Sequence, residues 1–196
     1  MTKRAEQREE TRDRIIEAAA DCFSGLGFRG ASTREIARRA GTNQGLITYH
    51  FKSKDELWRA AADRIFQQLR TSLRASAAAA TSEDPKEQNR ELIREFVRFS
   101  AAHPELFRMM VEEGKSDDPR MHWLVDTHLR HLYEGIPEFS AGPDGTLGPH
   151  LYYMLAGAAS VIFAVAPECR RLTGLDPTSD DAVETHANLV AHLMVP

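Results

Sequence analysis

The stretch from residue 32 to residue 54 constrains this chain most, because it has the spacing of two short helices joined by a tight turn. Ser32 followed three residues later by Glu35 is the pattern of a capping box, so the first helix is expected to begin here. Gly41 can adopt the left-handed conformation that ends a helix at low cost. The pattern therefore predicts a helix from Ser32 that stops at Gly41.

Asn43 can cap a second helix, whose inner side carries Ile47 and Phe51. Ala37 lies where two steeply crossing helices would touch, and a small side chain is needed there. This spacing is typical of a helix-turn-helix, whose second helix enters the DNA major groove. The alternative for so short a pattern is an ordinary helical hairpin.

The polar side chains of this pair suit contacts with DNA. Thr33 and Arg34 open the first helix, where a hydroxyl suits a phosphate and an arginine can reach a guanine edge. Gln44 is the candidate for reading a base directly, and Tyr49 and His50 suit phosphates. For each residue alone, solvated surface is the alternative. The expected DNA-binding set is Thr33, Arg34, Asn43, Gln44, Gly45, Thr48, Tyr49, His50 and Lys54.

The run TREIARRAGTNQGLITYHFKSKDEL, with the preceding RDRIIEAAADCFSGLGFRGAS, resembles the N-terminal domain of the TetR family of transcriptional regulators. The match covers about the first quarter to third of the chain. The resemblance implies phosphate-contacting roles for Tyr49, His50 and Lys54. The chain departs from the family pattern at Thr42, where a small valine-like residue is common, and at Thr48, where a tyrosine is usual. A different operator preference is the expected consequence.

The net charge of −4 is unevenly distributed along the chain. Residues 1–54 carry +4 and the remainder −8. A basic end facing phosphate and an acidic body kept away from it suit a DNA-binding module. Basic residues of the leader could lie along DNA phosphates, although frayed and solvated termini are commoner. These residues are Lys3, Arg4, Arg8 and Arg12.

The composition, and the glycines and prolines that separate helical stretches, predict a soluble all-α protein. Hydrophobic residues make up 42% and charged residues 28%, and no stretch alternates with the period of a strand. Two distant cysteines, Cys22 and Cys169, indicate reduced thiols in a cytoplasmic protein, and no signal peptide is recognised. The expected domains are a three-helix helix-turn-helix head over residues 1–52 and a helical effector-binding and dimerisation body over residues 53–196. The expected helices cover residues 7–26, 32–40, 43–51, 53–80, 85–102, 104–113, 119–133, 149–168 and 181–195, with a loop over 135–149.

The helix that begins at Pro149 is apolar nearly all round from Leu151 to Ala166. A membrane span is one interpretation, but the uncharged run is shorter than the ~20 residues needed, so burial is favoured and no membrane contact is expected. Gly157 and Ala158 would allow a neighbour to approach closely. We expect the last two helices to pack against their symmetry mates in a homodimer, with simple burial inside one subunit as the alternative.

No pattern in the chain predicts an enzyme, because phosphate loops, nucleophile elbows and HExxH motifs are missing from the sequence. His122, Asp126, His128 and His131 crowd one helix but do not share a face, so no metal or cofactor is expected.

Aromatic and methionine side chains of the body could line a cavity for an apolar small molecule, although core packing is the default for each. The expected effector-binding set is Phe107, Met110, Trp123, Tyr152 and Tyr153.

Together these patterns predict a TetR-type regulator, a repressor that binds a palindromic operator in double-stranded DNA as a homodimer and is released by a small-molecule effector. The alternative is a helical adaptor whose head binds protein instead of DNA.

Overall fold

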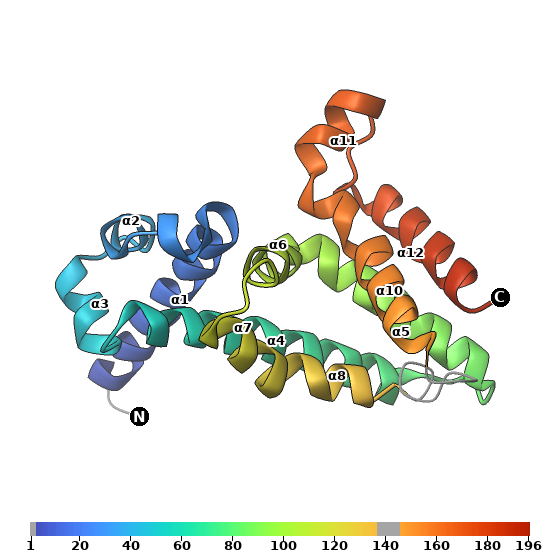
Figure 1. Ribbon diagram of the computed structural model, residues 1–196, viewed down its shortest axis with the longest axis horizontal. Helices are drawn as coiled ribbons and strands as arrows, with labels where there is room; N and C mark the ends of the chain where they lie inside the picture. Colours follow the sequence, from blue (N-terminus) through green and yellow to red (C-terminus); the bar gives the residue numbers. More distant parts are fainter. Residues whose placement is uncertain (1–2, 137–145) are drawn as a thin grey trace.

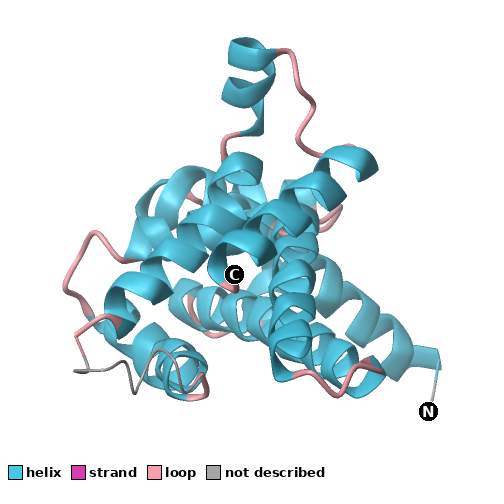
Figure 2. Cartoon of the chain, turned by 90° about the vertical axis from the view of Figure 1, so that its right-hand side faces the viewer, coloured by secondary structure: helices cyan, strands magenta, loops and turns pink. Residues whose placement is uncertain are grey.

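The computed structural model of the chain describes residues 3–136 and 146–196, and these residues are helices joined by short loops (Figures 1 and 2). The all-α fold expected from the sequence is confirmed. Most of the loop expected over residues 135–149 lies outside the described residues.

The three N-terminal helices form the head. They are α1 (Lys3–Gly30), α2 (Thr33–Arg39) and α3 (Gln44–His50). Gly41 has a φ of 61°, so the left-handed residue stands where the turn needs it. Asn43 Oδ1 accepts from Leu46 N at 3.0 Å and caps α3 as predicted. The helix-turn-helix is therefore set by local capping.

The capping box predicted at Ser32 forms only in part. Ser32 Oγ accepts from Glu35 N at 3.1 Å. The Glu35 carboxylate instead accepts from Arg38 and Arg39, at 2.7 to 2.8 Å. Two charged guanidinium donors bind the carboxylate more strongly than one backbone amide does.

The first helix is longer than the predicted 7–26. It begins at Lys3 and, at Gly27, kinks through a φ of 67° before its final turn. The regular helix is interrupted at Gly27, next to the predicted end at residue 26, because glycine adopts this positive φ without steric cost. The kink turns Phe28 back toward the head, where its ring stacks on Phe23 at 5.8 Å.

A long helix, α4 (Lys54–Ala79), runs from the head into the body, which the remaining helices complete (Figure 1). Two differences from the sequence prediction stand out. The helix expected over 119–133 contains a π-helical segment, η1, and a short exposed helix, α11, was not predicted. The body helices after α4 are α5 (Pro85–Ala102), α6 (Pro104–Glu113), α7 (Pro119–Leu124), η1 (Val125–Leu129), α8 (Arg130–Glu134), α10 (Gly148–Ala164), α11 (Ala166–Thr173) and α12 (Asp180–Met194).

The main hydrophobic core runs from the head into the body without a break. Ile15 and Ile47 of the head share it with Trp58 of α4 and Leu106 of α6. A second cluster, around Phe163, joins α10 to α5 and α12. The domain boundary at residues 52 and 53 stays a prediction, and apolar packing crosses it.

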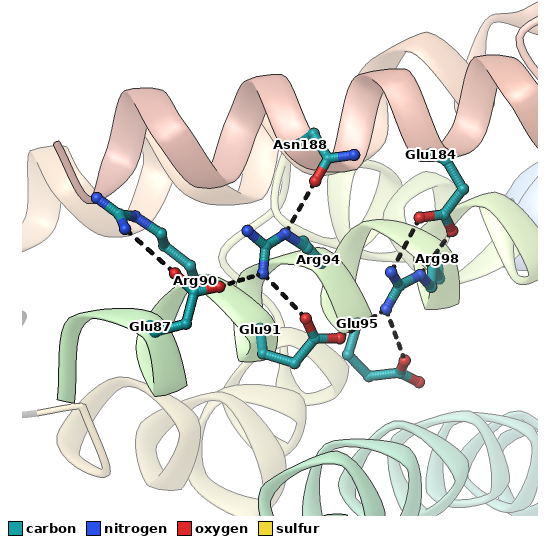
Figure 3. Close-up of polar contacts among 8 residues, drawn as sticks. All are labelled: Glu87, Arg90, Glu91, Arg94, Glu95, Arg98, Glu184 and Asn188. Atoms are coloured by element: carbon teal, nitrogen blue, oxygen red, sulfur yellow. Dashed lines mark hydrogen bonds and ion pairs between the residues drawn. The ribbon is translucent and has the colours of Figure 1, made fainter. Parts of the chain in front are cut away.

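A ladder of charged side chains joins α5 to α12 (Figure 3). Arg98 donates to both carboxylate oxygens of Glu184, at 2.7 and 2.9 Å. One turn earlier, Arg94 Nε donates to Asn188 Oδ1 at 3.0 Å, and its other nitrogen pairs with Glu87 and Glu91. Bidentate and shared pairs of this kind set the register of the two helices.

Helix α10 is only half covered within the subunit. Ala159, Ser160 and Phe163 are buried, whereas Tyr153 and Met154 are 73% and 60% exposed. Burial on every side, one of the two expectations for this helix, is therefore not found within one protomer. Further large apolar side chains are exposed on and next to α10 and α12: Val161, Val165, Leu189 and Leu193.

Among the described residues, no single helix has both the length and the apolarity of a membrane span. Helices α10 and α11 pass that test only as a pair bent by 74°. Helix α11 projects away from the rest of the chain in both views (Figures 1 and 2).

Candidate DNA-binding surface

Helices α2 and α3 carry seven of the nine predicted DNA-binding residues, whereas Asn43 caps α3 and Lys54 begins α4. Gln44 Nε2 donates to Thr33 Oγ1 at 3.0 Å across the turn. This hydrogen bond orients the Gln44 amide and leaves its carbonyl oxygen and second N–H for another partner. Thr48 Oγ1 donates to Gln44 O at 3.2 Å, so that hydroxyl is partly used within α3.

Six of the nine predicted residues are exposed and three are half-buried. The half-buried residues are Thr33, His50 and Lys54. The exposed residues are Arg34, Asn43, Gln44, Gly45, Thr48 and Tyr49. The contacts with DNA themselves stay predictions.

Tyr49 is the most prominent aromatic side chain on this face, with 64% of its surface exposed. The Arg8 guanidinium of α1 lies 5.4 Å from its ring centroid, and His50 packs edge-on against it at 5.1 Å. Partial burial, followed by the nearby charges of Arg8 and Arg12, lowers the pKa of His50. A neutral His50 is therefore favoured, and the positive charge beside Tyr49 comes from α1.

Lys54 does not project freely from the start of α4. Its Nζ lies 4.6 Å from the centroid of the Phe28 ring. Burial and the nearby Arg120 lower the pKa of Lys54. The predicted phosphate contact of Lys54 would thus be made from a side chain that also packs on Phe28.

Arg120 of α7 ties the body to the same aromatic ring. Its Cζ lies 4.0 Å from the Phe28 centroid, within the range of a cation–π contact. Arg120 Nε donates to Glu113 Oε2 at 2.9 Å, and its Nη2 donates to Asp118 Oδ2 at 2.7 Å. Glu113 is only 4% exposed, and burial raises its pKa. This contact between head and body was not predicted, because Arg120 and Phe28 are far apart in sequence.

Two of the three arginines of α2, Arg38 and Arg39, are already paired with Glu35. Hydrogen bonds from Arg38 and Arg39 lower the pKa of Glu35 to about 2. Among the basic residues of α2, only Arg34 has no ion pair with a described residue. It is therefore the α2 side chain best placed to meet a new anion.

The five predicted effector-binding residues are spread over three helices. Phe107 and Met110 lie on α6, and Met110 packs on the main core. Trp123 of α7 meets Trp58 edge-on at 5.5 Å. Tyr152 of α10 packs against Tyr133 of α8 at 5.6 Å, whereas the neighbouring Tyr153 faces outward. Because Tyr153 faces outward, the five side chains do not converge as a set, and their joint role stays a prediction.

The histidine and aspartate side chains of α7 and η1 contact different partners. His122 pairs with Asp117, and Asp126 pairs with Arg130. His128 is buried with its ring stacked 4.4 Å from that of Phe66. Within the described residues, no three His, Cys, Asp or Glu side chains are arranged to hold a metal ion.

A helix-turn-helix head with an exposed polar second helix, joined by a long helix to an all-helical body, is an arrangement typical of DNA-binding regulators. Residues 15–61 match the family model described as bacterial regulatory proteins, tetR family. The predicted resemblance to the TetR family of transcriptional regulators is confirmed, and the matched residues are those of the head and the start of α4.

Two curated relatives and one solved structure illustrate the match. The transcriptional repressor NicS of Pseudomonas putida is 34% identical over 114 residues, 57% of this chain and 51% of that protein. The regulator Mb3439c of Mycobacterium bovis is 28% identical over 193 residues, 96% and 92% of the two chains. The structure of AibR with isovaleryl coenzyme A and operator DNA has a TM-score of 0.71 at 16% identity, over 95% and 98% of the chains.

The alignments to the first of the curated relatives span 51% to 63% of those proteins' own length. The structural match covers nearly the whole chain, and at 16% identity it establishes the fold.

Proposed function

We propose that this protein is a transcriptional repressor that binds a palindromic operator as a homodimer and releases it when a small molecule binds the body. The observation that carries the proposal is the exposed polar face of α3, where Gln44, Thr48 and Tyr49 stand on a helix with a buried Ile47 beneath them. A rigidly seated helix of this kind can enter the major groove without losing its own core contacts.

The exposed apolar surface of α10 and α12 supports the homodimer. Contiguous apolar surface on a soluble chain commonly marks a contact with another molecule. Small residues on the same helix, Gly157 and Ala158, permit close approach by the same helix of a second copy. A two-fold axis there would pair two heads, so each head would read one half of a palindrome, with half-sites about one turn of DNA apart (~34–36 Å) or a multiple of it.

Release by an effector is supported by how the helices connect. Helix α6 packs against α1 of the head and against α10 and α5 of the body. A ligand that binds one arrangement of α6 more tightly than another shifts the equilibrium between them, and with it the position of the head. The free energy of this shift is limited to the difference between the two binding free energies. The structure of AibR, which has the same fold, holds isovaleryl coenzyme A together with operator DNA.

Selection of bound duplexes from a random DNA pool tests the proposal. Recovery of a palindrome, with binding that weakens steeply as salt rises, is the expected result. Enrichment of no sequence would overturn it. If the protein is instead a helical adaptor that binds another protein through an apolar groove, binding of that partner should depend little on salt.

A further inference from the structure

Three arginines of α1 lie four residues apart and so form a stripe on one face of that helix: Arg4, Arg8 and Arg12. Residues at this spacing lie one above another along a helix. The same face continues into Ile15 and Ala19, which are fully buried in the head core. Packing of Ile15 and Ala19 in the core therefore fixes which way the arginine stripe faces. The stripe lies on the same face of α1, beyond the edge of the core.

The stripe runs beside the recognition helix. Arg8 lies over the Tyr49 ring, and Arg12 lies 5.5 Å from the Phe51 centroid at the end of α3. Arg4 and Arg8 line an open hollow of about 420 Å³ together with Tyr49 and His50. Arg4 and Arg8 thus share one concave surface with α3.

Most of the acidic side chains on this part of α1 lie on the side of the helix opposite the stripe. They are Glu6, Glu10 and Asp13, and Asp13 is paired with Arg64 of α4 at 2.8 Å. Glu9 lies beside the stripe, where its charge acts on His50. None of the three stripe arginines forms an ion pair with any residue that the structure describes. Their charges remain available to an anion from outside.

We propose that Arg4, Arg8 and Arg12 bind the phosphodiester backbone next to the half-site read by α3. This inference rests on the proposed function, because it assigns a second contact surface to the same DNA complex. The stripe is about 12 Å long, from an eight-residue separation at ~1.5 Å per residue. Phosphates on one strand advance by ~3.4 Å along the axis per nucleotide, so the stripe spans more than one phosphate.

Phosphate contacts of this kind position the protein and carry no base information. The stripe therefore strengthens binding to every sequence and widens the bound stretch of DNA. A neutral His50 beside the stripe can still donate one hydrogen bond to a phosphate oxygen, while the arginines supply the charge.

The test compares operator binding by the wild type with that by Arg4→Gln/Arg8→Gln/Arg12→Gln over a range of salt concentrations. Each lost phosphate contact reduces the slope of log affinity against log salt by about 0.9. A dimer that loses six contacts should lose about five units of slope, with the ranking of operator sequences unchanged. The matched control, Arg74→Gln/Arg130→Gln/Arg171→Gln, removes the same charge from the body and should keep the wild-type slope.

A second readout uses duplex length. Trimming the duplex to the selected palindrome should weaken the wild type and leave the triple variant unaffected, because only the wild type uses the flanking backbone. Circular dichroism checks that the variant is folded. Should loss of the half-buried Arg12 unfold the head, Arg4→Gln/Arg8→Gln changes only exposed residues. A dimer of this variant loses four contacts and should lose about 3.6 units of slope.

Equal salt slopes for the wild type and the folded variants would overturn this inference and leave the proposed function standing. A slope reduced as much by the body control as by the stripe variant would also overturn it, since net charge would then explain the effect. Failure of the wild type to select any duplex would end both proposals.

Discussion

At the scale of single residues, Gln44 and Lys54 illustrate how the structure divides labour on the proposed DNA surface. Gln44 is oriented by Thr33 and is exposed, whereas Lys54 carries a charge without a planar hydrogen-bonding group. Amide side chains discriminate bases, and a lysine meeting a phosphate does not.

Gln44→Ala should therefore change the preference among operator sequences, by about 1–3 kcal/mol at the base pair that Gln44 reads. Lys54→Met, which keeps the aliphatic stem that packs on Phe28, should weaken binding to all sequences and flatten the salt slope by about one unit per subunit. Fluorescence anisotropy with a set of duplexes measures both. Equal effects of the two changes on every duplex would contradict this division.

His128 is the buried residue whose protonation the fold opposes. Its Nδ1 lies 3.1 Å from Arg70 Nη1, and because a guanidinium only donates, Nδ1 must be the unprotonated acceptor. Nε2 lies 2.9 Å from Asp63 Oδ1 but without hydrogen-bond geometry. Burial is the largest cause that lowers the pKa of His128; Asp63 opposes the shift and Arg70 adds to it.

Because the folded pKa lies below the usual ~6.5, the unfolded chain takes up the proton first as the pH falls. The free energy of unfolding should then decrease below about pH 6.5, by up to about 1.4 kcal/mol per pH unit from this group. His128→Phe, which keeps the stack on Phe66, should remove that part of the pH dependence in urea denaturation. The exposed His150→Gln serves as the control, and an unchanged profile in His128→Phe would contradict the prediction.

At the scale of elements, the contact of α7 with the end of α1 depends on Arg120, whose guanidinium pairs with Glu113 and Asp118. Arg120 neutralises the buried Glu113 and covers the Phe28 ring. Removing one partner of a buried pair leaves the other charge uncompensated, which costs far more than the pair itself contributes. The junction between head and body is thus sensitive to either residue alone.

Arg120→Met should lower the free energy of unfolding by about 3 kcal/mol, because it leaves the Glu113 carboxylate buried without its cation. Glu113→Gln/Arg120→Met should recover most of that loss. Denaturant titration of both single variants and the double variant measures the coupling between the two residues. If the changes in the free energy of unfolding of the two single variants simply add in the double variant, Glu113 and Arg120 are not coupled.

At the scale of the whole molecule, most of the large apolar side chains that are exposed lie in the body, away from the head. Helices α10 and α12 expose large side chains on the outer part of the body, while the recognition helix lies at the far end of α4 (Figure 1). A second copy of the chain packed on the exposed face of α10 and α12 would leave both recognition helices free. The proposed dimer and the proposed DNA contact are thus compatible in one assembly.

Ala158→Glu should give a monomer by multi-angle light scattering, since it places a charge in the proposed α10 contact. Palindrome binding should weaken in parallel, because each half-site would be bound separately. Ala80→Glu, at an exposed position next to the end of α4, should leave the assembly unaltered. An unchanged dimer in Ala158→Glu would remove α10 from the interface.

Local chemistry determined what the sequence could predict. Caps at Ser32 and Asn43 and the left-handed Gly41 act within a few residues, so the head motif was predictable in position and type. Prolines at the first turns of α5 and α6 placed those helices for the same reason.

Contacts between distant segments were decided only by the tertiary structure. Phe28 meets Arg120, and Arg8 lies over Tyr49, because packing brings their helices together across long stretches of chain. The π-helical turn at η1 and the half-covered face of α10 likewise depend on what each helix packs against. Spacing along one helix reports which residues share a face, but only the packed fold determines what that face meets.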